Sequence, residues 1–386
     1  MDLTGTWNYP TSYHFGAGRI KSLPEQAAAL GVKRPLVVTD PGLADLDIVK
    51  DIVANLMSAG LGAGVFSNIK ANPTGTNVMD GVRAFRSGEH DGAIVVGGGS
   101  ALDAGKAIAL LAGQSLDIWE VVDEGDNWTR VDVSLIPPII AVPTTAGTGS
   151  EVGRASVITD EKAHAKKIIF HPKMLPGLVI ADPELTVGLP PGLTAATGMD
   201  ALSHNLEAFC APGYHPMARG ISIEGIRLIK RWLPNAFADG RDIEARSHML
   251  VASSMGATAF QRGLGAMHAL AHPLGALYDA HHGTLNAILM PYVLLANKTA
   301  IEDDIAELTQ SLGFKKTGFT PFLDWVLAIR EELKMPHTLG DIGIDDTRAQ
   351  EIGIMAVNDP TASTNPILHD ATTYADILER CVAGKL

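Results

Sequence analysis

The chain has 386 residues, of which 46% are hydrophobic, and its formal net charge at pH 7 is −13. This length allows two domains with large cores, and the negative charge argues against nucleic acid or an anionic membrane as the main partner. A local cationic pocket for an acidic substrate is compatible with this charge.

Cysteine usage and hydropathy indicate a cytoplasmic protein. The only two cysteines, Cys210 and Cys381, lie far apart in the sequence, so we expect no disulfide framework. Residues 1–7 contain no basic stretch followed by an apolar run, so we expect no signal peptide. No apolar run reaches the length of a membrane span, so we expect no membrane contact.

Short apolar runs alternate with amphipathic stretches through the first half of the chain. This alternation, with glycine-rich segments after the strands, predicts an open, mostly parallel α/β sheet that binds its ligand at the carboxyl ends of the strands. The expected strands are residues 36–40, 64–66, 92–96 and 139–143, and the expected helices are residues 46–59, 78–87 and 101–111.

The segment Gly97-Gly98-Gly99-Ser100 follows an expected strand and precedes an expected helix. Without Cβ atoms the backbone can approach a phosphate closely, and the helix N-terminus offers free N–H groups and a favourable dipole. A tight turn is the alternative. Leu102 stands where the third glycine of G-x-G-x-x-G belongs, and Ala107 after Lys106 excludes a Walker A motif. The pattern indicates a phosphate-bearing ligand and leaves open whether it is a mononucleotide or a dinucleotide.

Polar residues follow two further strands of the expected sheet. Thr144, Thr145 and Thr148 lie in a second glycine-rich segment, where hydroxyls can reach phosphate, ribose or nicotinamide, although threonine is also common in turns. Asp40 ends an early strand, as a ribose-binding carboxylate does in dinucleotide-binding domains. The sequence Asp40-Pro41-Gly42 is equally compatible with a simple turn.

The second half of the chain is helical almost throughout. Runs of β-branched residues stop before the turn at residues 189–192. We therefore predict an α/β domain over residues 1–188 and an all-helical domain over residues 189–386. The expected helices of the second domain include residues 195–210, 218–233, 243–260 and 303–312.

One carboxylate and several histidines of the helical domain have the spacing of a metal site. Asp200 and His204 are four residues apart, so on a helix both side chains share one face, and His268 and His272 repeat this spacing. His282 follows in the same part of the chain. Oxygen and imidazole ligands suit Fe²⁺, Zn²⁺, Co²⁺ or Ni²⁺, and the lack of a thiolate argues against a closed structural zinc site.

The metal interpretation depends on the whole set, because a single histidine on an apolar helix is more often a core residue. Spacing alone does not decide whether His272 is a ligand. His281 is the weakest member, since adjacent side chains rarely point the same way. Gly283 allows a tight backbone next to His282.

Short motifs spread along nearly the whole chain carry a family resemblance. In order they are Phe15-Gly16-Ala17-Gly18, Asn72-Pro73-Thr74, residues 97–103, residues 143–152, residues 198–204, residues 268–276 and His282-Gly283. In this order and spacing they resemble the iron-containing (group III) alcohol dehydrogenases. The resemblance implies an N-terminal dinucleotide-binding domain and a C-terminal helical metal-binding domain, in an architecture like that of dehydroquinate synthase, with the active site in the cleft.

The resemblance also implies roles for individual residues of the helical domain. The metal ligands would be Asp200, His204, His268 and His282. His272 would lie near the substrate as a catalytic residue and would not be a ligand.

In the α/β domain, the resemblance implies a set of cofactor contacts. Lys166 would approach the cofactor ribose, with Lys167 as the alternative. The full set is Asp40, Asn72, Gly98, Gly99, Ser100, Asp103, Thr144, Thr145, Thr148 and Lys166.

The implied function is that of a metal-dependent, NAD-linked alcohol dehydrogenase. It would interconvert an alcohol and its aldehyde or ketone by hydride transfer while the metal polarises the substrate oxygen. We expect NAD in preference to NADP, and Fe²⁺, with Zn²⁺ or another divalent metal as the alternative. The expected partners are a small-molecule alcohol or aldehyde and further copies of the chain, in a homodimer or larger homo-oligomer.

Two other functions fit the same motifs. One is a hydroxyacid–oxoacid transhydrogenase or a reductase of an acid-bearing carbonyl of the maleylacetate type, and the other is a non-catalytic metal or nucleotide sensor. An acid-bearing substrate requires cations near the metal, for which the candidates are Arg154, Lys166, Lys167 and Arg262. These side chains are alternatively surface or cofactor-phosphate residues.

Overall fold

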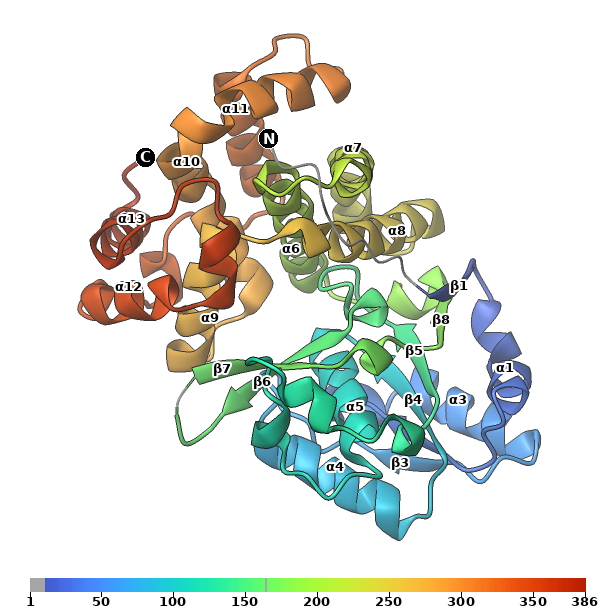
Figure 1. Cartoon of the computed structure of the whole chain (residues 1–386). Helices are drawn as coiled ribbons and strands as arrows, with labels where there is room; N and C mark the ends of the chain where they lie inside the picture. Colours follow the sequence, from blue (N-terminus) through green and yellow to red (C-terminus); the bar gives the residue numbers. More distant parts are fainter. Residues whose placement is uncertain (1–10, 164) are drawn as a thin grey trace. The chain divides into compact units, whose positions relative to one another are not determined.

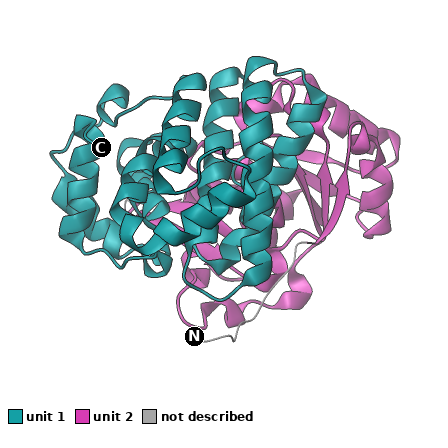
Figure 2. Cartoon of the chain, turned by 90° about the horizontal axis from the view of Figure 1, so that it is seen from above, with its two compact units in different colours: residues 1–8, 146–148, 189–386 teal, residues 9–145, 149–188 magenta. Residues whose placement is uncertain are grey.

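The computed structural model describes residues 11–163 and 165–386. These residues divide into two compact units (Figure 2). The α/β unit comprises the described residues from 11 to 145 together with those of Gly149–Gly188. The helical unit comprises Leu189–Leu386 and the short segment Ala146–Thr148, which leaves the sheet of the first unit and belongs with the helices of the second.

A parallel sheet forms the centre of the α/β unit (Figure 1). Its strands are β1 (Ser12–Phe15), β2 (Pro35–Val38), β3 (Gly64–Phe66), β4 (Gly92–Gly97), β5 (Ile139–Pro143) and β8 (Leu178–Ala181). Among the described residues these six strands follow the order β1-β8-β5-β4-β2-β3, and every neighbouring pair is parallel. Strands β2, β4, β5 and β8 are buried along their whole length, as in parallel sheets that are covered on both faces.

The helices of the α/β unit are α1 (Leu23–Ala29), α2 (Pro41–Ala44), α3 (Asp47–Ser58), α4 (Gly75–Ser87) and α5 (Gly99–Leu111). Three of them correspond to the helices predicted from the sequence. Helix α4 begins earlier than predicted because Thr74 and Asn77 form a capping box, in which each side chain accepts a hydrogen bond from the backbone N–H of the other. The predicted fold class is confirmed: a parallel-sheet α/β unit precedes a helical one.

An antiparallel hairpin of the α/β unit was not predicted. It consists of β6 (Ala155–Asp160) and β7 (Ala165–Phe170), which pair outside the main sheet. Residues of β6 alternate between half-buried and buried positions. This alternation is typical of a strand with one covered face, and the β-branched residues Val157, Ile158 and Thr159 carried that signal.

The described residues of the second unit form helices and no strands (Figure 1). Those predicted at residues 195–210, 218–233 and 243–260 correspond to α6, α7 and α8, whereas residues 303–312 lie within the last part of the long helix α10. The bounds are α6 (Pro191–Cys210), α7 (Pro216–Ala238), α8 (Ile243–Ala259), α9 (Ala266–Tyr278), α10 (His282–Ser311), α11 (Phe319–Glu332), α12 (Ala349–Val357) and α13 (Ala371–Ala383).

Helix α6 lies at the centre of the helical unit. It is buried along most of its length and packs against α7, α8 and α10. A helix buried in this way has no solvent face, so the polar residues that it carries must have partners inside the unit. In the part of the chain that the structure describes, no helix has the length and hydropathy needed to cross a membrane.

Candidate metal centre

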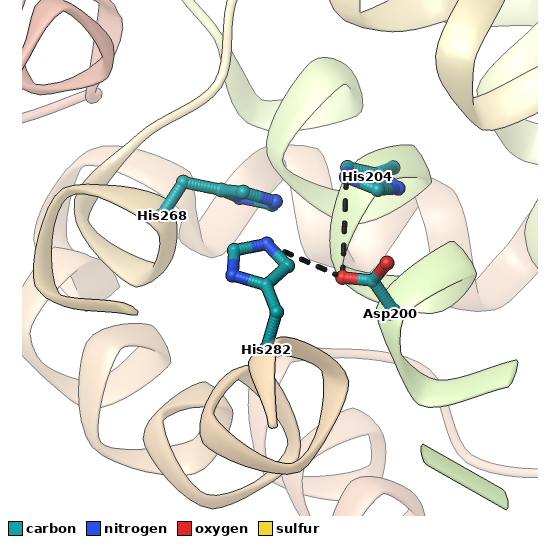
Figure 3. Close-up of side chains that lie close together, drawn as sticks. All are labelled: Asp200, His204, His268 and His282. Atoms are coloured by element: carbon teal, nitrogen blue, oxygen red, sulfur yellow. Dashed lines mark ion pairs between the residues drawn. The ribbon is translucent and has the colours of Figure 1, made fainter. Parts of the chain in front are cut away.

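Four side chains of the helical unit converge on one point (Figure 3). Asp200 and His204 come from α6, His268 from α9 and His282 from the first position of α10, and one donor atom of each lies within 4.8 Å of the others. Asp200 Oδ1 is 4.0 Å from His204 Nε2 and 3.6 Å from His282 Nε2. The first three residues are buried and His282 is partly exposed. The structure thus brings together the four residues predicted as ligands, as one carboxylate and three imidazoles.

Close packing of α10 against α6 places His282 beside Asp200. A Cβ atom on Gly283 would lie 2.2 Å from the carbonyl oxygen of Ala196 and 3.2 Å from Cβ of Asp200. Only glycine therefore fits at position 283, the second residue of α10. The sequence analysis explained Gly283 by a tight backbone, but the residue is helical and it is the contact between the two helices that requires glycine.

Burial keeps His204 neutral. Removal from water lowers the pKa of His204 to about 4. Its Nδ1 lies 3.3 Å from the carbonyl oxygen of Gly147, which can only accept a hydrogen bond. Nδ1 therefore carries the proton, and the lone pair of Nε2 is directed toward Asp200.

A buried glutamate, Glu207, holds His268. Its Oε2 lies 2.6 Å from His268 Nδ1, and its carboxylate also accepts hydrogen bonds from the backbone N–H groups of Gly265 and Met267 at 2.9 and 2.7 Å. Burial opposes a charge on His268, but the charge and hydrogen bond of Glu207 outweigh it and raise the pKa of His268. A carboxylate behind an imidazole is the usual arrangement at metal-binding histidines, because it fixes the tautomer and the ring orientation.

His272 is held in the same way by Asp359. The distance from His272 Nδ1 to Asp359 Oδ2 is 2.8 Å, and Asp359 also accepts hydrogen bonds from the backbone N–H and the hydroxyl of Thr361. Burial opposes ionisation of Asp359, but the contacts with His272 and Thr361 lower its pKa. The ring of His272 stacks on that of His282 with centroids 5.5 Å apart. His272 therefore lies next to the four-residue cluster and is not part of it, and its catalytic role remains a prediction.

The sequence analysis identified neither Glu207 nor Asp359. Glu207 carried a detectable signal, because it is an acidic residue in an otherwise apolar stretch of α6, one turn after His204. Asp359 lies just before a short 3₁₀ helix, Pro360–Thr364, and its sequence position gives no indication of a contact with His272. His281 is exposed at the N-cap of α10 and is not a member of the cluster.

In the α/β unit, Asp40 lies beside the glycine-rich turn. It follows β2, Gly97 ends the neighbouring strand β4, and a Cβ atom on Gly97 would lie 3.4 Å from Asp40 Oδ2. Oδ1 accepts hydrogen bonds from the backbone N–H groups of Gly42 and Leu43 and thereby caps α2. One oxygen thus stabilises the turn, and the other faces the carboxyl ends of two adjacent strands, where ligands bind in such sheets.

Other predicted cofactor residues lie near the same turn. The N–H of Thr144 donates to the carbonyl oxygen of Gly97 at 3.0 Å. A Cβ atom on Gly98, the N-cap of α5, would lie 3.1 Å from the hydroxyl oxygen of Thr145. Gly99 begins α5, and the next residue, Ser100, donates its hydroxyl to the carbonyl oxygen of Ala71.

The structure distinguishes between the two candidate lysines of the hairpin. Lys166 donates from Nζ to Oδ1 of Asn72 at 2.8 Å, which brings two predicted cofactor residues together. Nζ of Lys167 lies 3.3 Å from a carboxylate oxygen of Asp160 and 5.5 Å from the ring centre of Trp119. These contacts favour Lys166 over Lys167 as the lysine near the cofactor.

Two predicted cofactor residues have other surroundings. Asp103 is buried, its two carboxylate oxygens accept hydrogen bonds from the hydroxyl of Ser150 and the N–H of Val157, and Lys106 lies 3.5 Å from it. This favours a supporting role for Asp103 over direct contact with a cofactor. Thr148 belongs to the segment that groups with the helical unit.

The cations considered for an acidic substrate make contacts within the protein. Arg262 donates to the carbonyl oxygens of Gly213, Ala208 and Phe209, and burial lowers its pKa. The guanidinium of Arg154 lies 5.6 Å from the ring centre of Phe170. Arg262 therefore stabilises the main chain at the end of α6, and the structure favours this role over substrate binding.

Comparison with known proteins covers both units. Residues 10–183 match the model of the iron-containing alcohol dehydrogenases, and residues 194–382 match that of the C-terminal domain of the Fe-containing alcohol dehydrogenase family. The chain is 37% identical over 383 residues to 4-hydroxybutyrate dehydrogenase of Cupriavidus necator, covering 96% of this chain and 98% of that protein. It is 36% identical over 384 residues to 1,3-propanediol dehydrogenase of Citrobacter freundii, covering 96% and 97%.

Solved structures give the same assignment. An alcohol dehydrogenase from Oenococcus oeni aligns with a TM-score of 0.91 at 32% identity, over 97% of this chain and 100% of that chain. The resemblance inferred from the short motifs is thereby confirmed over nearly the whole sequence. The chain belongs to the iron-containing alcohol dehydrogenase family, and it is an oxidoreductase that acts on a CH–OH group.

Proposed function

We propose that the protein is a divalent-metal-dependent, NAD-linked dehydrogenase that interconverts a short primary alcohol and its aldehyde. The observation that carries this proposal is the convergence of one carboxylate oxygen and three imidazole nitrogens within 4.8 Å. This donor set fits Fe²⁺ and also Zn²⁺. The carboxylates of Glu207 and Asp359 behind His268 and His272 support a catalytic site over a passive one.

When bound, the metal would supply Lewis acidity, which lowers the pKa of an alcohol. Asp200, His204, His268 and His282 would hold the metal, and Glu207 keeps the Nδ1 proton of His268 directed away from it. His272 donates its Nδ1 proton to Asp359, so its Nε2 can accept the hydroxyl proton of the substrate.

The α/β unit would bind the cofactor. In this proposal, Asp40 accepts hydrogen bonds from the adenosine ribose, and the turn at Gly97–Ser100 receives the pyrophosphate at the start of α5. Lys166 and Asn72 would lie near the other ribose of NAD, which carries the nicotinamide. The two binding functions would then lie on different domains: residues 1–188 would bind NAD, and residues 189–386 would bind the metal and the substrate. When bound, the nicotinamide would supply the acceptor for the hydride of the carbinol carbon.

The relatives suggest the substrate class. Their names specify 4-hydroxybutyrate and 1,3-propanediol, which are both short primary alcohols with a second polar group at the far end. We propose a substrate of this kind. Because Arg262 already donates hydrogen bonds to main-chain carbonyl groups, we do not assign it a contact with the second polar group of the substrate. The names also favour a dehydrogenase over the transhydrogenase alternative.

Metal removal and reloading test the function. We expect that protein purified without oxygen and loaded with Fe²⁺ reduces NAD⁺ with 1,3-propanediol, 4-hydroxybutyrate and 1-butanol. Treatment with a chelator should lower the rate on the order of 100-fold or more, because Lewis-acid stabilisation contributes several kcal/mol. The measurement is the rate of NADH formation before chelation, after chelation and after reloading with Fe²⁺ or Zn²⁺. Full activity of the chelated protein would contradict the metal dependence, and no NADH with any alcohol would contradict the proposed reaction.

Replacing Asp40 tests the preference for NAD. Asp40→Gly should gain NADP use, because the carboxylate that repels a 2′-phosphate is gone. The ratio of kcat/KM for NAD and NADP should fall by about 10- to 100-fold, the worth of one charge-assisted hydrogen bond. Loss of the cap of α2 costs little, since glycine is tolerated at an N-cap.

Asp40→Asn is the matched control for this change. It keeps an oxygen to cap α2 and a group that can bond to the ribose, and it removes only the charge. We therefore expect an intermediate ratio. The assignment of Asp40 fails if the wild-type protein already uses NADP as well as NAD, or if neither variant changes the ratio.

A further inference from the structure

A fifth side chain, Asn286, lies in the candidate metal centre. It is on α10, one turn after His282, and its exposed fraction is 0%. Its Nδ2 donates to Asp200 Oδ1 at 2.9 Å and lies 3.3 Å from His268 Nε2 and 3.2 Å from His282 Nε2. One amide group thus contacts three of the four candidate ligand atoms.

The three neighbours of this amide nitrogen are all acceptors. Asp200 presents a carboxylate oxygen, and a neutral His268, whose Nδ1 proton is donated to Glu207, presents the lone pair of Nε2. A neutral His282 can likewise accept at Nε2. The amide nitrogen carries two protons for these acceptors. The lone pairs that it contacts are those that a divalent metal would require, so hydrogen bonding and metal binding compete for the same atoms.

The other end of the amide is unsatisfied. Among the described residues, the buried Oδ1 of Asn286 finds no hydrogen-bond donor. An unsatisfied buried acceptor costs free energy, and native proteins retain few of them. The orientation of the side chain is therefore not explained by hydrogen bonds to its own oxygen. In this orientation Nδ2 donates to the acceptors of the metal centre, while Oδ1 is left without a donor among the described residues.

We propose that Asn286 is a positioning residue that keeps the empty metal centre assembled by donating Nδ2 to ligand atoms that the metal takes over when it binds. The inference rests on the metal centre of the proposed function. In the metal-free protein, the amide of Asn286 links the carboxylate of Asp200 to the imidazoles of His268 and His282. The amide thus stabilises the empty form more than the loaded form, and it lowers the affinity for the metal.

The test compares Asn286→Ala with the wild type in the chelated and the Zn²⁺-loaded full-length protein. The chelated variant should melt at a lower temperature, whereas the loaded variant should melt close to the loaded wild type. The affinity for Zn²⁺, measured by calorimetry with a competing chelator, should rise by about 2- to 10-fold, which corresponds to the net worth of one hydrogen bond. Both readouts are independent of turnover.

Asn297 provides the matched control. It is a buried asparagine further along α10 that is not among the four converging residues, and its side chain exchanges hydrogen bonds with that of Asn365 at 2.8 and 2.9 Å. Asn297→Ala should lower the melting temperatures of the chelated and the loaded protein alike and leave the affinity for Zn²⁺ unchanged.

Each result has a definite meaning. Equal losses of melting temperature in the two forms of Asn286→Ala would overturn the inference, because an ordinary core residue behaves in that way. Weaker binding of Zn²⁺ would also overturn it, because Asn286 would then support the loaded form. A wild type that binds no Zn²⁺ would refute the metal centre itself, and the inference with it. Tighter binding by the variant, with only its empty form destabilised, is the expected result.

Discussion

Replacing His268 with alanine is expected to remove both the metal and the activity. His268 supplies one of the four converging donor atoms, and its ring is oriented by the 2.6 Å contact with Glu207. Alanine removes this donor and leaves the buried carboxylate of Glu207 without its imidazole partner. Replacing a residue that only hydrogen-bonds to a ligand typically lowers metal affinity about 10- to 100-fold, so we expect a larger loss when the ligand itself is removed. Metal content by elemental analysis and the rate of NADH formation are the measurements.

His248→Ala is the control for this variant. His248 lies on α8, where its ring stacks on Trp232 with centroids 4.5 Å apart, and it is not among the converging residues. Its replacement should leave metal content and activity within about twofold of the wild type, because it changes packing on a partly exposed helix face. A normal metal content in His268→Ala would disprove the assignment of His268 as a ligand.

Exchanging Glu207 for glutamine should weaken metal binding although no ligand is lost. Both oxygens of Glu207 accept hydrogen bonds, from the N–H groups of Gly265 and Met267 and from His268 Nδ1. A glutamine amide has only one oxygen, so its NH₂ group must face at least one of these donors. We expect about a 10- to 100-fold loss of metal affinity and a loss of about 1–3 kcal/mol in the free energy of unfolding.

Glu244→Gln is the matched control for Glu207→Gln. Glu244 lies 4.0 Å from His248 on α8, so it is also a glutamate beside a histidine, but its side chain is 70% exposed. Exposed pairs of this kind contribute little to stability, and this one is outside the metal centre. Zn²⁺ affinity and urea unfolding should therefore match the wild type. If Glu207→Gln also binds Zn²⁺ like the wild type, Glu207 does not orient His268 for a metal.

Local patterns in the sequence were sufficient for the strands β2, β3, β4 and β5 and for the candidate ligands, whereas β1 and β8 were not predicted. The apolar runs before Asp40, Gly97 and Thr144 became β2, β4 and β5, because a buried parallel strand requires little more than a short β-branched segment with a turn after it. The spacing of Asp200 and His204 put both side chains on one face of α6, because the period of the α-helix is the same everywhere. The alternation of β6 was equally local, but it was overlooked.

Only the tertiary structure decided which of these residues meet and what lies behind them. Glu207 and Asp359 contact histidines 61 and 87 positions away, and Asn286 reaches Asp200 across 86 positions. The packing of helices determines such contacts, and one sequence carries no local sign of it. The same reason separates His272 from the ligand cluster, although its spacing from His268 equals that of Asp200 from His204. Periodicity determines the face of a helix on which a side chain lies, and the neighbouring helices determine what that face meets.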